Sequence, residues 1–169
     1  VVEENRKITA DFTEVHASEG LEVYVTQATD FSISVEADEN IIDLIGTEIK
    51  NGKLKIHAIE NIGRATKKVY VSLPEVTGLL SSSGAHLTAQ NKLTATTLII
   101  DASSGAHLNA ETNADKLEID ASSGANIDIS GSAMDVYVDG SSGANVRAKN
   151  LMTTECRAEA SSGANININ

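Results

Sequence analysis

The second half of the chain repeats one short motif, Ser-Ser-Gly-Ala followed by His or Asn, five times. The motif glycines stand at positions 84, 105, 124, 143 and 163, so the successive intervals are 21, 19, 19 and 20. A unit of this length is too small to bury a core of its own, so neighbouring units must stack on one another. Glycine suits a corner that needs a positive φ. The predicted corner glycines are Gly84, Gly105, Gly124, Gly143 and Gly163.

Apolar residues recur at every second place on both sides of each motif, which is the period of a β-strand. Each unit is therefore predicted to hold two strands of about five residues, joined by the Ser-Ser-Gly corner. The other side of the unit is predicted to turn at variable corners, such as 112–115 and 130–132. The row three places after each glycine is expected to face the core: Leu87, Leu108, Ile127, Val146 and Ile166.

Equivalent strands of successive units must then pair in parallel, as a flattened solenoid with two facing sheets. The intervals between glycines are not multiples of six, which argues against left-handed hexapeptide coils. Parallel crossovers are in general right-handed. The sequence therefore predicts an all-β fold, a right-handed parallel β-helix of about 20 residues per coil. All 169 residues are expected to form a single domain.

The first part of the chain, 1–75, lacks the motif and is predicted to form irregular coils that cap one end of the regular repeats, 76–169. Alternating segments predict strands at 21–25, 31–35 and 68–73. Asn51-Gly52 predicts a hairpin between 47–50 and 53–56. One short helix is predicted over 38–45, with Asp38 as its N-cap.

Charge and composition exclude several classes of partner. A formal net charge of −11 argues against binding to nucleic acid and to anionic membrane surfaces. No apolar run is long enough for a direct membrane span. The chain begins at Val1 without methionine, as a processed export product would, and export is the expectation. Cys156, the single cysteine, falls in an inward row and is expected to be a buried small hydrophobe.

A row of carboxylates is predicted four places before the corner glycines, on adjacent coils about 4.8 Å apart. Like charges placed opposite one another destabilise a sheet, so the row needs an explanation. One hypothesis is a bridging divalent cation, calcium in particular. We favour the alternative that the carboxylates stay solvated and accept hydrogen bonds from nearby serines and corner amides, because calcium requires six or more oxygens. The row consists of Asp101, Asp120, Asp139 and Glu159.

A second outward row follows each Ser-Ser-Gly-Ala corner. Its two histidines could hold a transition metal or sense pH. A stacked ladder, in which side chains on neighbouring coils satisfy one another, is the commoner meaning of such a row, and we favour it. An outward tyrosine, Tyr137, could add an aromatic platform for sugar. The predicted surface-contact residues are thus His86, His107, Asn126, Asn145, Asn165 and Tyr137.

Enzymatic chemistry has little support in the sequence. Polysaccharide lyases on solenoids need a base near acidic metal ligands, and glycosidases need two carboxylates in distinct environments. Asp120 and Asp139 would be close enough for a retaining pair, but they belong to a uniform row. No nucleophile motif or phosphate loop is present. No catalytic residue is predicted, although a polysaccharide-active enzyme stays an alternative, as does a structural envelope scaffold that assembles through its ends.

The run from Ile8 to Ile56 contains Glu22-Val23-Tyr24-Val25-Thr26-Gln27, a Val35–Asn40 segment and Asn51-Gly52-Lys53-Leu54. Together with the later Ser-Gly corners it resembles the putative auto-transporter adhesin head domain, the GIN domain family of Gram-negative gut bacteria. That family often has Gly-Ser-Gly at corners where this chain has Ser-Ser-Gly. The resemblance implies a protein exported to the outer-membrane surface, periplasm or extracellular space, without established catalytic residues. It implies binding to a host or bacterial surface protein or glycan, and it suggests a homo-oligomer.

Overall fold

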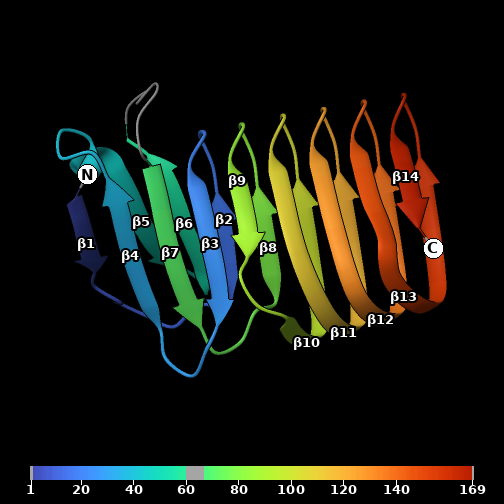
Figure 1. Cartoon of the computed structure of the whole chain (residues 1–169), viewed down its shortest axis with the longest axis horizontal. Helices are drawn as coiled ribbons and strands as arrows, with labels where there is room; N and C mark the ends of the chain where they lie inside the picture. Colours follow the sequence, from blue (N-terminus) through green and yellow to red (C-terminus); the bar gives the residue numbers. More distant parts are fainter. Residues whose placement is uncertain (1, 60–66, 169) are drawn as a thin grey trace.

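The computed structural model describes residues 2–59 and 67–168, and it is a β-solenoid with the two termini at opposite ends of its long axis (Figure 1). Strands on the near side of Figure 1 run down and those on the far side run up as the chain advances toward the C-terminus. This is a right-handed winding. The predicted right-handed parallel β-helix is therefore confirmed.

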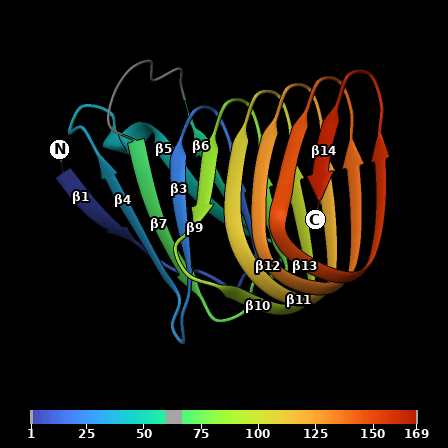
Figure 2. The ribbon, with the colours of Figure 1, turned by 45° about the vertical axis from the view of Figure 1, so that its right-hand side comes forward.

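The regular coils pair in parallel and in register, motif upon motif. Core-facing positions such as Leu108, Ile127 and Val146 are direct neighbours on successive coils. Figure 2 shows the coils stacked one behind another, with the two sheets facing each other. The strands of this region are β8 Gly78–Ser81, β9 His86–Ala89, β10 Leu93–Ala102, β11 His107–Ala121, β12 Asn126–Gly140, β13 Asn145–Ala160 and β14 Asn165–Ile168.

The Ser-Ser-Gly corners are tight turns with two left-handed residues each. In the corner 82–85, Ser83 has a φ of 51° and Gly84 one of 75°, and the Ala85 N–H donates to the Ser82 carbonyl at 3.0 Å. This is the geometry of a type I′ turn. The corners also bond to one another, because the Gly105 N–H donates to the Ser123 carbonyl on the next coil at 3.0 Å. Glycine at the second left-handed position was expected, and serine at the first was not.

The predicted variable corners at 112–115 and 130–132 are wrong as breaks between strands. Strands β11, β12 and β13 run through these positions without interruption and bend there (Figure 2). The bend is spread over several residues because each strand keeps its hydrogen bonds to the coils beside it, and a separate turn would leave those groups unpaired. Gly131, with a φ of 110°, provides the sharpest point of the bend in β12.

The final interval, from Gly143 to Gly163, is longer by one than the two before it, and it contains a β-bulge. The register between β12 and β13 shifts between Asp128 and Ser130: Arg147 lies opposite Asp128, whereas Asn150 lies opposite Ser130. Two positions of β13, 148 and 149, therefore face a single position of β12, which is the definition of a bulge.

The N-terminal part contains one more coil that the sequence analysis missed. Strands β2 Glu14–Ala17 and β3 Glu22–Gln27 pair in parallel with β8 and β9. Their corner, 18–21, has Glu19 and Gly20 at φ values of 58° and 72°, as in the motif turns. Glutamate replaces the second serine, and a long insertion separates Gly20 from Gly84, so the repeat pattern does not reveal the corner.

The segment 28–75 is inserted between this coil and the regular repeats. It extends the two sheets toward the N-terminal end, partly with antiparallel pairs (Figure 1). The predicted hairpin is confirmed: Asn51 and Gly52 have φ values of 54° and 76°. The remaining strands are β1 Val2–Arg6, β4 Ser32–Ala37, β5 Ile45–Lys50, β6 Lys53–Ala58 and β7 Lys67–Leu73.

The predicted helix over 38–45 is much shorter in the structure, a single 3-10 turn η1 at Ile42–Leu44. Its N-cap is Ile41, without a side-chain cap, so the assignment of Asp38 as N-cap is wrong. The Asp38 carbonyl instead accepts hydrogen bonds from the Ile41 and Ile42 N–H groups. The helix ends early because Ile45, a buried residue, already belongs to strand β5.

The core is a continuous column of buried aliphatic side chains between the two sheets, and it is exposed at the C-terminal coil. Leu108 and Ile127 are buried, whereas Ile166 at the same repeat position is half-buried. The expectation of a buried Cys156 is wrong, since its side chain is exposed. Cys156 lies beside Val136 in the inward row, but among the described residues no further coil covers it. Partial burial still raises the pKa of its thiol.

No helix within 2–59 and 67–168 has the length and apolar character needed to cross a membrane.

Candidate functional site

The solenoid has two broad outward surfaces. The front face is formed by β3, β7, β9, β14 and the first parts of β11–β13, and it is the near side in Figure 1. The back face is formed by β2, β6, β8, β10 and the later parts of β11–β13. Parallel in-register pairing places the same repeat position of every coil in one row along a face. The candidate site residues therefore form rows.

The back face carries the carboxylate row. Asp101, Asp120, Asp139 and Glu159 are direct neighbours on four successive strands. Burial, followed by the neighbouring carboxylate, raises the pKa of both Asp101 and Asp120. No serine or corner amide of the described chain donates to the row, so that part of the expectation is wrong. The corner amides bond to backbone carbonyls instead, and Glu159 accepts from Tyr137 Oη at 3.2 Å.

A cation site needs several oxygens that converge on one point, whereas the carboxylates of this row lie along a line. Among the described residues, no three His, Cys, Asp or Glu side chains come together in a way that could hold a metal ion. Calcium binding by the row stays the less favoured hypothesis, for which titration calorimetry is the test.

Replacing the central carboxylate of the row should stabilise the protein at neutral pH. A carboxyl group with a raised pKa binds its proton more tightly in the folded state, so its ionisation costs stability as pH rises through the folded pKa. Because Asp120 is exposed and water screens the repulsion, Asp120→Asn should raise the free energy of unfolding by at most about 0.5 kcal/mol at pH 7. The gain should vanish below pH 3.8, the ordinary value, where the carboxyl is protonated in both states. Urea unfolding at the two pH values measures this, and a gain that persists in acid would contradict it.

The front face carries the His–Asn row as the ladder that we favoured. The rings of His86 and His107 stack with centroids 4.5 Å apart and planes 8° apart. Asn145 Nδ2 donates to Asn126 Oδ1 at 3.2 Å, and Asn165 Nδ2 donates to Asn145 Oδ1 at 3.1 Å. The asparagines of this row thus hydrogen-bond to one another along the solenoid, and the two histidines stack.

Exchanging both histidines for asparagine should change stability little. The variant His86→Asn/His107→Asn would extend the amide ladder by two coils. Amide hydrogen bonds that stabilise the fold by a similar free energy would then replace the ring stacking. We expect the free energy of unfolding to stay within about 0.5 kcal/mol of the original. Urea unfolding is the measurement, and Glu111→Gln on the same face provides a surface control. A large loss in the histidine variant would show that the imidazoles have a role that amides cannot fill.

Aromatic side chains lie on both faces. Tyr137 lies on the back face between Glu118 and Arg157 and is 36% exposed. The structure adds a pair that the sequence analysis missed: Tyr24 and Tyr70 stack on the front face with ring centroids 5.3 Å apart. These residues are distant in sequence, and strands β3 and β7 bring them together. Each tyrosine stands between two valines, but so does Tyr137, so this pattern alone could not have paired the two strands.

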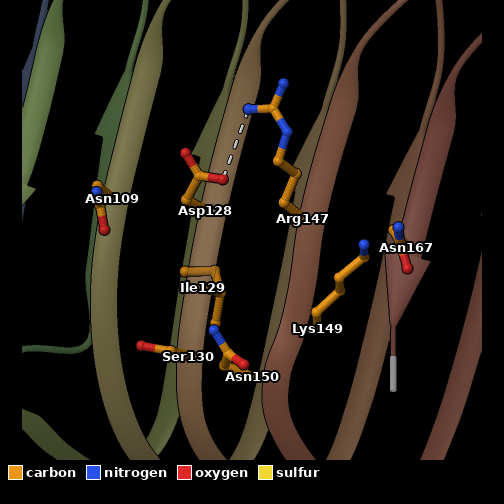
Figure 3. Close-up of a pocket in the computed structure, with 8 residues that line it drawn as sticks. All are labelled: Asn109, Asp128, Ile129, Ser130, Arg147, Lys149, Asn150 and Asn167. Atoms are coloured by element: carbon orange, nitrogen blue, oxygen red, sulfur yellow. Dashed lines mark ion pairs between the residues drawn. The ribbon is translucent and has the colours of Figure 1, made fainter.

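A concave pocket of about 430 Å³ opens on the front face, over strands β11–β14 (Figure 3). Four of its residues form one row of strand partners, Asn109, Asp128, Arg147 and Asn167. Arg147 Nη1 lies 3.6 Å from Asp128 Oδ1. The pocket is completed by Ile129, Ser130, Lys149 and Asn150. None of these eight residues was predicted as a site.

A second pocket, of about 520 Å³, lies on the back face where the β5–β6 hairpin meets the first coils. His16, Lys55 and Asp101 line it, together with His57, whose Nε2 lies 3.4 Å from Glu48 Oε1. Burial lowers the pKa of His16, and its Nε2 is buried without a hydrogen-bond partner in the described chain. Oppositely charged and neutral groups are mixed here, so the pocket does not favour one ligand charge.

The comparisons with known proteins agree with this architecture. The family model described as "Putative auto-transporter adhesin, head GIN domain" matches residues 11–169. The chain belongs to this family. A putative adhesin from Bacteroides fragilis NCTC 9343 has a similar structure, with a TM-score of 0.89, 18% identity, and coverage of 98% of this chain and 78% of that one. Membership suggests a cell-surface or exported protein.

Two further solved structures share the fold of this family member. A putative adhesin from Parabacteroides merdae ATCC 43184 has a TM-score of 0.76 and 15% identity, covering 98% of this chain and 79% of that one. A putative lipid binding protein from Parabacteroides distasonis ATCC 8503 has a TM-score of 0.77 and 17% identity, with coverage of 98% and 81%. None of the curated proteins that were compared matches the chain. At these identities the structures establish the fold, and they transfer no residue roles.

Proposed function

We propose that this protein is an exported surface or envelope protein that binds a host or neighbouring surface without catalysing a reaction. Membership of a family of adhesin head domains supports this. The observation that carries the proposal is the front face, where polar side chains repeat in register on a rigid stack of coils. The His–Asn row and the row through Asn109 and Asn167 run side by side over it. Such a surface can present many equivalent contacts to an extended partner.

The similar surroundings of two neighbouring carboxylates in the row argue against a catalytic pair. An acid–base pair needs two groups whose surroundings separate their pKa values. In the carboxylate row, Asp101 and Asp120 have pKa values shifted in the same direction by the same two causes. Repetition of one environment supports a structural or surface role over a tuned catalytic pair.

The binding role can be tested with the purified, labelled domain. We expect saturable binding to host epithelial cells, to matrix proteins or to arrayed glycans, and displacement by an excess of unlabelled domain. A β-solenoid of similar charge from another family controls for non-specific adhesion. Protease accessibility on intact producing cells tests export. Binding no stronger than that of the control solenoid on every surface would contradict the proposal.

A structural scaffold that assembles through its ends is the second candidate, because the last described coil leaves part of the core uncovered. Ala158 and Cys156 are exposed there, and Ile166 and Ile168 are only half-buried. An unpaired coil edge of this kind is able to accept further strands. Sedimentation over a range of protein concentrations distinguishes this candidate, since assembly through the end must increase with concentration.

A further inference from the structure

The front-face pocket is locally cationic in a strongly acidic molecule. Its charged residues are Arg147, Lys149 and Asp128, within a chain of net charge −11. The Arg147–Asp128 contact is 3.6 Å long, and 63% of the Arg147 side chain is exposed. Lys149 has no ion-pair or hydrogen-bond partner among the residues that the structure describes. One positive charge in the pocket is therefore not neutralised by the protein.

The β-bulge leaves two successive residues of β13, Lys149 and Asn150, on the surface at the pocket. The extra residue of the last interval lies at 148–149, where it interrupts the one-to-one pairing with β12. Bulges re-aim side chains and recur beside functional sites. Ala148 keeps its buried place in the core, and Lys149 is left on the surface. Figure 3 shows its side chain extending over the front face toward Asn167, away from Asp128.

The neutral polar side chains of the pocket have free hydrogen-bonding groups. Within the described chain, the side chains of Asn109, Ser130, Asn150 and Asn167 make no hydrogen bond. The amides of the neighbouring row differ, because Asn126 and Asn145 bond to each other at 3.2 Å. Amides and a hydroxyl that both donate and accept are the groups that match sugar hydroxyls. Four such groups around one unpaired ammonium group form a site with unused hydrogen-bonding capacity.

We propose that this pocket binds a carboxylate-bearing sugar, such as a uronic acid residue of a glycan. This inference rests on the proposed surface-binding function and names its ligand class. Lys149 holds the carboxylate, Arg147 adds positive charge on the side of Asp128, and the asparagines and Ser130 bind the hydroxyls. The volume of about 430 Å³ falls in the usual range for small-ligand pockets. An acidic peptide fits less well, because peptide recognition depends on buried apolar anchors and only Ile129 contributes an apolar wall.

The test compares two disaccharides that differ in one group, one ending in glucuronic acid and one ending in glucose. We expect the full domain to bind the acidic disaccharide about tenfold more tightly at low salt, with a smaller difference at high salt. Lys149→Gln should remove most of this preference. Asp128→Asn should strengthen it, because it removes the negative charge of Asp128 from the pocket. Lys116→Gln, on the back face, is the matched control and should change nothing.

Equal binding of the two disaccharides would overturn the inference, as would an unchanged preference in Lys149→Gln. Equal affinity for a glutamate-rich hexapeptide would also overturn it, in favour of a protein ligand. Circular dichroism of each variant establishes that it is folded. If the domain adheres to cells while these disaccharides show no preference, the ligand class is wrong and the surface-binding function stands. If the domain adheres to nothing, the function itself fails.

Discussion

Replacing Gly131 with alanine should lower the free energy of unfolding by about 2–4 kcal/mol. Gly131 lies at the bend of β12 with a φ of 110°, a conformation that side chains with a Cβ rarely adopt. A Cβ at this position would overlap the backbone carbonyl of Thr112 on the coil beside it. Because the clash is with backbone, no side-chain rotation relieves it. Urea unfolding followed by circular dichroism measures the loss.

The matched control is Gly124→Ala, at a motif corner. Gly124 has a φ of 77°, but a Cβ there would meet nothing within 4 Å. The expected loss is about 1 kcal/mol, from backbone conformation alone. The two variants separate the cost of a positive φ from the cost of the close approach between coils. If both variants lost the same amount, the bend at Gly131 would have to relax more easily than the packing of β11 on β12 suggests.

The repeats made the regular half of the fold predictable because a repeat carries register information. When equivalent segments stack in parallel, the same position of each unit faces the same way. Leu108, Ile127 and Val146 were therefore assignable to the core from spacing alone, and burial confirms this. The spacing of the motif did not reveal how the chain turns at the side of the coil opposite the Ser-Ser-Gly corner. Turn-forming residues at 112–115 and 130–132 marked where the chain bends, but they do not distinguish a break between strands from a bend within one strand.

The N-terminal half was less predictable because its pairing is long-range. Local signals found the Asn51-Gly52 hairpin, whose strands are adjacent in sequence. They missed the corner at Glu19 and Gly20, whose partners in the next coil follow the insertion 28–75. No local sequence pattern predicts that β2 and β8 pair. Once an insertion separates two coils, the period that identifies them is lost.

The same reasoning explains which part of the candidate site was foreseen. The carboxylate and His–Asn rows depend only on register, so their order followed from the motif. The front-face pocket depends on a bulge. The interval from Gly143 to Gly163 shows that one residue is extra, but it does not say where the strand accommodates it. That choice is made by packing, which keeps Ala148 and Leu151 in the core and leaves Lys149 and Asn150 between them outside.

The second large effect is expected from the core, where Ile127→Ala should cost about 3 kcal/mol of unfolding free energy. Ile127 is fully buried and lies between Leu108 and Val146 on the adjacent coils. Removing its side chain leaves a cavity that rigid neighbouring coils close poorly. Each coil of a solenoid is held mainly by its neighbours, so the coils from β12 to the C-terminus should also unfold earlier than the rest. Urea unfolding, with hydrogen exchange to locate the early loss, measures both effects.

Ile166→Ala is the control, because Ile166 occupies the same repeat position at the exposed end of the solenoid. Its side chain is half-buried, so the expected loss is about 1 kcal/mol. A loss as large as that of Ile127→Ala would mean that another surface covers this end in solution. Repeating the measurement at several protein concentrations shows whether a second copy of the chain covers this end. Only then does the loss of unfolding free energy depend on protein concentration. The same pair of variants therefore tests core packing and the assembly of the solenoid through its C-terminal end.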